Sequence, residues 1–164
     1  MIRVRRAFLT AAAALVLGGT SLTAQQVDRF GDWLLVQFPD QRCRLAQTVL
    51  SRRSGNELVE IWLDEEPQGT AVISARVPVG VDLAAGIAYR HPSRQTAVPL
   101  IWQMCGPDKC LAQAQITADE LTRLRRGNLI TLAFVPVRGS RALRVAVSLR
   151  GVTSGLRAQA ACRG

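Results

Sequence analysis

The chain has 164 residues, of which 48% are hydrophobic and 20% charged, and 21 basic against 12 acidic residues give a net charge of +9. This length fits one domain, and the composition excludes wholesale disorder, a collagen-like chain and a coiled coil. The charge alone would suggest a nucleic-acid binder, but only 5% of the residues are aromatic, so stacking platforms among the basic residues are scarce. We therefore expect no nucleic-acid partner.

Residues 1–24 have the pattern of a secretory signal peptide. Three arginines precede Ala7 to Leu17, where ten of eleven residues are apolar, and small residues follow. An apolar run of eleven residues is too short to cross a bilayer about 30 Å thick. The pattern predicts cleavage after export by the Sec or the twin-arginine route, and a periplasmic, envelope-associated or secreted protein. Residues 25–164 then form a single domain with a net charge of +6, and we expect no transmembrane segment in it.

Most predicted elements after residue 25 are β-strands, because apolar residues recur at every second position. In residues 142–149, for example, Leu143, Val145, Val147 and Leu149 share one face. We predict strands at residues 33–38, 44–50, 57–63, 70–79, 87–90, 98–103, 111–116, 129–135 and 142–149, with turn residues between them. Short strands without regular intervening helices predict an all-β fold, an antiparallel sandwich or barrel.

One short helix is predicted at about residues 117–126, between the seventh and eighth strands. Thr117 and Glu120 form a capping box, Leu121 and Leu124 share a face, and Gly127 follows the basic last turn. We expect this helix to cover an open end of the sheets. Residues 154–161 give only a weak signal for one more helical turn.

The four cysteines are an even number in a chain predicted to be exported, which favours disulfides. Cys105 and Cys110 flank turn residues, so the chain can reverse and bring the two together, which leaves Cys43 with Cys162. A redox site at Cys105 and Cys110 is the alternative, although such sites usually have two intervening residues beside a βαβ pattern. A four-cysteine zinc site needs two closely spaced pairs, and only one exists here, so no metal is expected.

No catalytic constellation stands out in the sequence. His91, the one histidine, precedes Pro92 and is expected in a surface loop, and there is no Gly-x-Ser-x-Gly nucleophile elbow. The densest acidic cluster, Asp64, Glu65 and Glu66, has the composition of a glycosidase pair, but consecutive acids before a proline are typical of a solvated strand end. Nucleotide-binding and EF-hand motifs are absent. We expect no catalytic residue and no cofactor.

Two pairs of arginines form the candidate basic interaction surface. Arg52 and Arg53 lie in the predicted hairpin loop 51–56, and Arg123 and Arg126 lie on the predicted helix. Such residues can dock onto anionic lipid head groups, lipopolysaccharide or an acidic protein, although scattered basic residues more often form only a solvated surface. The expected partner is an unknown component of the envelope or of a host.

Five blocks of the sequence resemble the invasion-associated locus B family. They are Phe30-Gly31-Asp32-Trp33, residues 77–87, residues 105–112, the predicted helix with Gly127-Asn128, and residues 147–153, and together they extend over roughly residues 28–158. The resemblance implies an exported periplasmic or envelope protein of Gram-negative bacteria with an immunoglobulin-like β-sandwich. It also implies a link of some members to host-cell invasion, and no established catalytic residues.

One departure from the family pattern concerns the cysteines. Family members often carry a cysteine shortly after Gly-Asp-Trp that pairs with the next cysteine, and this chain has Gln37 at that place. The resemblance therefore implies that Cys43 lacks its usual partner and that Cys162 replaces it. The leading hypothesis is an exported, non-catalytic envelope binding or host-interaction protein. The rival is a periplasmic enzyme, or a thiol-redox protein that uses Cys105 and Cys110.

Overall fold

The structure, a computed structural model, describes residues 27–40 and 42–162. Its elements in chain order are β1 (Val27–Phe30), β2 (Trp33–Gln37), β3 (Cys43–Leu50), β4 (Glu57–Glu65), β5 (Ala71–Pro78), η1 (Leu83–Ala85), β6 (Ile87–Arg90), β7 (Val98–Cys105), β8 (Lys109–Ile116), α1 (Ala118–Arg126), β9 (Leu129–Phe134), β10 (Leu143–Ser148) and α2 (Val152–Cys162). The nine predicted strands and the predicted helix all occur, whereas β1 has no counterpart among the predictions. The predicted signal peptide, residues 1–24, lies outside the described residues.

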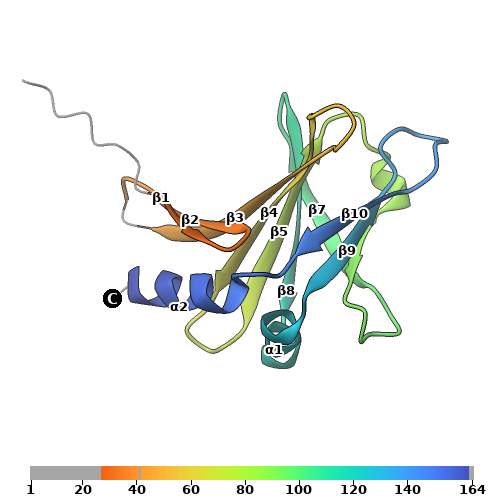
Figure 1. The fold of residues 1–164 in the computed structure, drawn as a ribbon. Coiled ribbons are helices and arrows are strands. Elements are labelled where there is room, and N and C mark those ends of the chain that lie inside the picture. The colour runs from red at the N-terminus through yellow and green to blue at the C-terminus, as the bar shows by residue number, and fades with distance from the viewer. Residues whose placement is uncertain (1–26, 41, 163–164) are drawn as a thin grey trace, which may run out of the picture.

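The strands form one antiparallel sheet in the order β1-β2-β3-β4-β5-β8-β7-β6-β9-β10, which curls into a half-barrel (Figure 1). The prediction of an antiparallel, mostly β fold is confirmed. The immunoglobulin-like sandwich of two facing sheets is replaced by this single curled sheet, because β7 pairs with β8 along one side and with β6 along the other. The register of β7 against β8 shifts between Trp102 and Met104, and such a bulge bends a sheet without dividing it.

The inside of the half-barrel holds the hydrophobic core. On β4, the inward-facing Val59, Ile61 and Leu63 are buried, as the alternating pattern of this strand predicts. Trp62 points to the outer face, where the guanidinium of Arg44 lies 4.5 Å from the centre of its ring system and covers it. The core therefore lies on one face of the sheet, and polar side chains cover the other.

Side chains, rather than a strand ladder, join the two edges of the sheet. The indole nitrogen of Trp33 donates to the Ser148 carbonyl over 2.8 Å. The amide of Gln47 donates to the Asp32 and Ser148 carbonyls, and its oxygen accepts from the Ser148 N–H. The N–H of Asp32 also donates to the carbonyl of Arg150 over 3.0 Å. These bonds fix how far the half-barrel closes.

Helix α1 begins as predicted, at Thr117, whose hydroxyl accepts the Glu120 N–H over 3.3 Å. The second half of the predicted capping box differs. The Glu120 carboxylate turns into the protein, where it accepts from the hydroxyl of Tyr89 over 3.1 Å and from Arg94 over 2.6 Å. The helix is thereby attached to β6 and to the loop that follows it.

Helix α2 is the larger departure, since it has eleven residues where the sequence gives only a weak signal for one turn. Its buried residues include Gly155 and Gln159, which interrupt the apolar periodicity that would reveal a helix. Leu45 of β3 fills the space beside Gly155, because a Cβ there would lie 2.5 Å from a Leu45 methyl carbon. Tertiary packing therefore stabilises this helix against β2 and β3.

The half-barrel has two different ends (Figure 1). One end, here called the hairpin end, carries the loops 51–56, 79–86, 106–108 and 135–142. The other end, here called the helix end, carries α1, α2 and the turn 66–70 between β4 and β5. Antiparallel pairing alone assigns each loop to its end.

Candidate functional site

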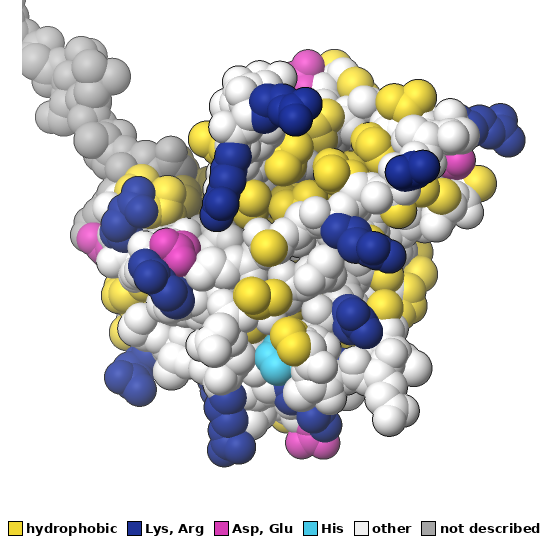
Figure 2. Space-filling view, turned by 45° about the vertical axis from the view of Figure 1, so that its right-hand side comes forward, with side chains coloured by type: hydrophobic (Ala, Val, Ile, Leu, Met, Phe, Trp, Pro, Cys, Tyr) yellow, Lys and Arg dark blue, Asp and Glu magenta, His cyan; other side chains and the backbone are white. Residues whose placement is uncertain are grey.

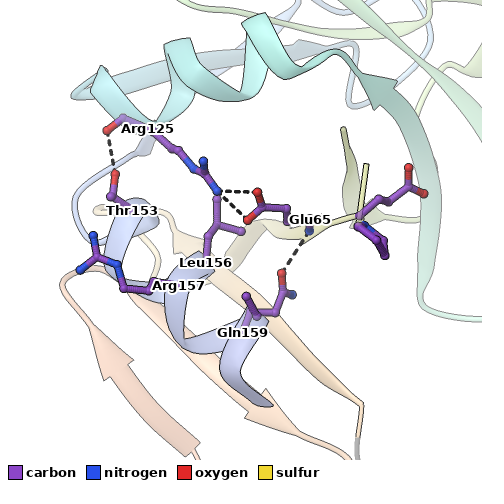
Figure 3. Close-up of a pocket in the computed structure, with 9 residues that line it drawn as sticks. Glu65, Arg125, Thr153, Leu156, Arg157 and Gln159 are labelled. Carbon is purple, nitrogen blue, oxygen red and sulfur yellow. Dashed lines mark hydrogen bonds and ion pairs between the residues drawn. The ribbon is translucent and has the colours of Figure 1, made fainter. Parts of the chain in front are cut away.

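The main candidate site is a cleft at the helix end with a volume of about 480 Å³. It lies between α2, the end of β4 and Arg125 at the C-terminal turn of α1 (Figure 3). Its lining includes Glu65, Arg125, Thr153, Arg157 and Gln159. They come from three elements far apart in the sequence: β4 supplies Glu65, α1 supplies Arg125, and α2 supplies the other three.

The charged groups at the centre of this cleft neutralise each other. The terminal nitrogen of Arg125 lies 2.6 Å from both carboxylate oxygens of Glu65 (Figure 3). Both side chains are partly buried, with relative exposures of 35% and 21%. Thr153 of α2 donates from its hydroxyl to the backbone carbonyl of Arg125 over 2.9 Å. The ion pair therefore joins β4 to α1, and Thr153 joins α1 to α2.

Gln159 is fully buried, and its amide group is bonded at both atoms. The amide oxygen accepts from the Glu65 N–H over 3.1 Å, and the nitrogen donates to the carbonyls of Cys43 and Leu63 and to the carboxylate of Asp64. Beside it, the disulfide between Cys43 and Cys162 joins the last residue of α2 to β3, with 6.2 Å between the two Cα atoms. The polar groups under the cleft thus serve to hold α2 in place.

Arg157 adds positive charge to the lining of the cleft. It is exposed, and among the described residues it has no ion pair. A small ligand with a negative group would therefore find Arg157 available in this cleft, beside the Glu65–Arg125 pair whose charges cancel.

The acidic cluster at the end of β4 is not the solvated strand end that the sequence suggests. Asp64 accepts from two nitrogens of Arg44, at 2.9 Å and 2.5 Å, and from Gln159. Glu66 accepts from the hydroxyl of Thr70 over 2.6 Å and from the amide of Gln115. With Glu65 bound to Arg125, all three carboxylates serve as structural bonds between neighbouring elements.

The outer face of the sheet carries a further network of paired charges. The ammonium of Lys109 lies 2.6 Å from Glu57 and 3.0 Å from Glu60, and Glu60 also pairs with Arg76 over 3.1 Å. Burial lowers the pKa of Lys109, but the two carboxylates outweigh it and raise that pKa above its ordinary value. The two carboxylates thus stabilise the charge of Lys109 and balance it.

His91 is buried, so its expected position in a surface loop is wrong. Its Nδ1 accepts from the Ser93 N–H over 3.2 Å and lies 2.7 Å from the Ser93 hydroxyl. Its Nε2 faces Gly127, where a Cβ would lie only 2.2 Å away. The glycine that ends α1 therefore also makes room for the imidazole, a contact that the sequence pattern does not reveal.

The second disulfide closes the hairpin between β7 and β8. Cys105 and Cys110 lie directly opposite each other in the strand register, with 3.9 Å between the Cα atoms, and the Gly106 N–H donates to the Lys109 carbonyl inside the turn. Both cysteines belong to strands and neither begins a helix, where a helix dipole would favour a reactive thiolate. The bond cross-links β7 and β8 at the closed end of their hairpin.

The structure divides the candidate basic surface into two parts. Arg52 and Arg53 are exposed at the hairpin end, whereas Arg123 and Arg126 are exposed on α1 at the helix end. The nine residues of β4 connect these ends, a distance of about 30 Å. Arg123 also lies 3.8 Å from Glu120 of the same helix. The two pairs therefore do not form one surface.

A buried polar cluster escaped the sequence analysis altogether. It consists of the buried Tyr89 and Glu120 and the partly exposed Arg94, with Glu120 accepting hydrogen bonds from both partners. Burial and the neighbouring carboxylate raise the pKa of Tyr89 well above its ordinary value, and the bond to Glu120 raises the pKa of Arg94. The only signal in the sequence was Glu120 itself, which the capping-box pattern assigned to a different bond.

Among residues 27–40 and 42–162, no group of three or more His, Cys, Asp or Glu side chains is placed to hold a metal ion. Within the same residues, no helix is long and apolar enough to cross a membrane.

The comparison with known families decides the identity of the fold. The sequence model of the Invasion associated locus B (IalB) protein matches residues 36–160, which is most of the chain. The chain belongs to the IalB family. No curated protein matches the sequence. The crystal structure of invasion associated protein B from Bartonella henselae superposes on this IalB-family fold with a TM-score of 0.74 and 16% sequence identity, over 84% of this chain and 98% of that one.

The match confirms the resemblance to the IalB family; four of the five sequence blocks lie within residues 36–160, and Phe30-Gly31-Asp32-Trp33 precedes that range. At 16% identity, the Bartonella structure establishes the shared fold, and residue roles do not follow from it. The matched range 36–160 includes Cys43 and ends just before Cys162, so the residue that closes the first disulfide lies outside the matched range.

Proposed function

We propose that this IalB-family protein is an exported, non-catalytic component of the cell envelope that acts by binding a partner. The observation that carries the proposal is the state of the cleft at the helix end. Its central carboxylate is held by Arg125, and the amide of Gln159 is bonded at both atoms to the backbone and to Asp64. A general acid or base needs a proton position that can change during the reaction, and these groups are held in fixed bonds.

Export is supported by three observations. The first 24 residues have the signal-peptide pattern, two disulfides join all four cysteines, and a protein of the same fold carries the name invasion associated protein B. Disulfides persist in the periplasm and outside the cell, whereas thiols are kept reduced in the cytosol. A role at the envelope or in contact with a host cell fits all three.

The first experiment tests the location. Cells that express the full chain with a C-terminal tag are divided into cytoplasmic, periplasmic and membrane fractions, and free thiols are alkylated in each fraction. We expect processed protein without free thiols outside the cytoplasm. A protein that stays in the cytoplasm with reduced cysteines would overturn the proposal.

The second experiment tests the absence of catalysis. The purified protein is incubated with peptidoglycan, lipopolysaccharide and denatured envelope protein, and products are measured together with those of a Glu65→Gln variant. We expect no turnover by either protein. Turnover that the wild type shows and the folded Glu65→Gln variant lacks would identify an enzyme and reject the binding role.

The thiol-redox alternative is decided by one further measurement, the reduction potential of the Cys105–Cys110 pair against a glutathione series. A structural bond has a potential far below that of the thiol pool, and a catalytic or regulatory one is more oxidising. We expect the former, because the pair closes a strand hairpin.

A further inference from the structure

Exposed apolar side chains gather at the hairpin end of the half-barrel. Of the eight large hydrophobic side chains that are exposed in the described part of the chain, five lie there, namely Leu50, Val79, Leu83, Met104 and Val137. Their relative exposures run from 46% for Val79 and Leu83 to 64% for Met104. Apolar side chains that protrude together from the loops of one end are typical of an interaction surface.

Hydrogen bonds and an ion pair hold the loops of this end beside one another. The Val79 N–H donates to the Asp108 carbonyl over 3.1 Å, and the Asp82 N–H donates to the Val135 carbonyl over 2.9 Å. The contact of Lys109 with Glu57 joins the base of the loop 51–56 to the β7–β8 hairpin. These contacts place Val79, Leu83 and Val137 on one surface, and Leu50 and Met104 lie at the strand ends that border it.

Four arginines accompany these side chains, namely Arg52 and Arg53 in one loop and Arg138 and Arg141 in another. All four are exposed, and within the described residues none of them has an ion pair. Figure 2 shows hydrophobic side chains over the upper part of the molecule with basic side chains at their border. On the outer face of the sheet, by contrast, Arg44 pairs with Asp64 and Arg76 pairs with Glu60.

Acidic groups at this end do not cancel the four arginines. Glu57 is occupied by Lys109, and the carboxylate of Asp82 accepts from the Ala84 N–H at the start of η1. Asp82 keeps its negative charge, and Asp108 in the β7–β8 hairpin is the other acid, so two acids stand against the four arginines. The hairpin end thus keeps a net positive charge around its apolar side chains.

We propose that the hairpin end docks onto the surface of a bilayer rich in anionic phospholipid. The apolar side chains enter the head-group region and bury their surface there. The arginines bind the lipid phosphates and supply the electrostatic attraction. Recognition of an acidic protein is the alternative, and the vesicle and polyglutamate measurements below distinguish the two. The inference rests on the proposed function, because export is what brings this surface to a membrane.

The test is flotation of the protein with vesicles of phosphatidylcholine, with and without phosphatidylglycerol, at low and high salt. All described elements lie within residues 27–162, so a chain that begins at Gln25 keeps every contact described above. We expect binding only with phosphatidylglycerol, weaker at high salt. The double variant Arg52→Gln/Arg53→Gln should bind about 30-fold more weakly, roughly fivefold for each arginine.

Two further variants separate the proposed surface from general basicity. Leu83→Ser/Val137→Ser removes exposed apolar groups and should also weaken binding. The matched control, Arg29→Gln/Arg126→Gln, removes two exposed arginines away from the hairpin end and should bind like the wild type. Equal losses in the control and in the Arg52/Arg53 variant would reject the proposal.

Tryptophan fluorescence gives an independent reading of insertion. The indole nitrogen of Trp102 donates to the Leu83 carbonyl over 3.1 Å, so this side chain lies next to the proposed surface, whereas Trp33 and Trp62 are buried. Vesicles with phosphatidylglycerol should shift the emission to the blue, and the shift should vanish in a Trp102→Phe variant. A shift that persists in this variant would contradict docking at the hairpin end.

The remaining outcomes also decide the question. Tight binding of polyglutamate, together with normal vesicle binding by Leu83→Ser/Val137→Ser, would show recognition of acidic macromolecules by charge alone and would reject lipid docking. Absence of vesicle binding by a protein that is found in the periplasm would reject this inference and leave the proposed function intact. Vesicle binding by a protein that stays in the cytoplasm would support docking and reject export.

Discussion

Loss of the Cys43–Cys162 disulfide should destabilise the protein far more than loss of the Cys105–Cys110 disulfide. The perturbation is a pair of double variants, Cys43→Ala/Cys162→Ala and Cys105→Ala/Cys110→Ala. They are well matched, because each removes one buried cysteine, Cys43 or Cys110, and one more exposed partner. The difference between them therefore reports mainly the length of the loop that each bond closes.

The expected magnitudes follow from the sequence separations of 119 and 5 residues. A cross-link stabilises mainly by restricting the unfolded chain, and the chain-entropy model gives about 5 kcal/mol for the long loop and about 2 kcal/mol for the short one. The native position of α2 has other supports, namely the buried Leu156 and the bonds of Gln159. The large loss should thus come from the unfolded state, with α2 still formed in the native one.

The assay is urea unfolding followed by far-ultraviolet circular dichroism, with the free energy of unfolding taken by linear extrapolation. The variant without the long cross-link should also show a larger m-value, because its unfolded chain exposes more surface. Native spectra with unchanged helix content would confirm that α2 stays formed. Equal losses of stability in the two variants, or a larger loss for Cys105→Ala/Cys110→Ala, would refute the loop-entropy reasoning.

Three further predictions concern single side chains. Gln159→Leu should cost about 3 kcal/mol in the free energy of unfolding, because it removes the hydrogen bonds that the buried amide makes with backbone groups of β3 and β4 and with Asp64. Gly151→Ala should cost more than about 2 kcal/mol, since its Cβ would lie 1.8 Å from the Phe30 carbonyl oxygen. Tyr89, the one tyrosine, should remain un-ionised in the folded protein well above pH 10, so folded stability should fall by up to about 1.4 kcal/mol per pH unit there.

Matched variants control the first two predictions, and tyrosinate absorbance measures the third. Gln103→Leu changes an exposed glutamine and should leave urea unfolding almost unchanged. Gly139→Ala has a similar positive φ but nothing within 4 Å of the new Cβ, so it should cost only the backbone strain, about 1 to 2 kcal/mol. For Tyr89, the pKa is higher in the folded than in the unfolded protein, so the unfolded chain loses this proton first. The free energy of unfolding therefore falls as the pH rises above 10. Tyrosinate absorbance at pH 11 in the folded protein would contradict it.

The strands, the turns and helix α1 were predictable because their signals are local. Alternation on β4 and β10 marks one buried face, and the cap at Thr117 needs only the N–H three residues later. Helix α2 was not predictable in this way, because its sequence lacks a regular apolar stripe and contacts with β3 stabilise it. The buried position of His91 was also hidden, since it depends on the missing side chain of Gly127.

The sequence by itself determined a mostly β, antiparallel fold, the positions of nine strands and α1 along the chain, and a favoured pairing of the cysteines, since periodicity, turn residues and the Cys105–Cys110 spacing are local. Only the tertiary structure decided how the sheet closes and what its charges do. The bulge in β7 and the bonds of Trp33 and Gln47 make one half-barrel instead of two facing sheets. The same fold brings Arg125 to Glu65 at the helix end and leaves Arg52 at the hairpin end. Residues so far apart in the sequence meet only when the strands between them have paired, and no local pattern records that pairing.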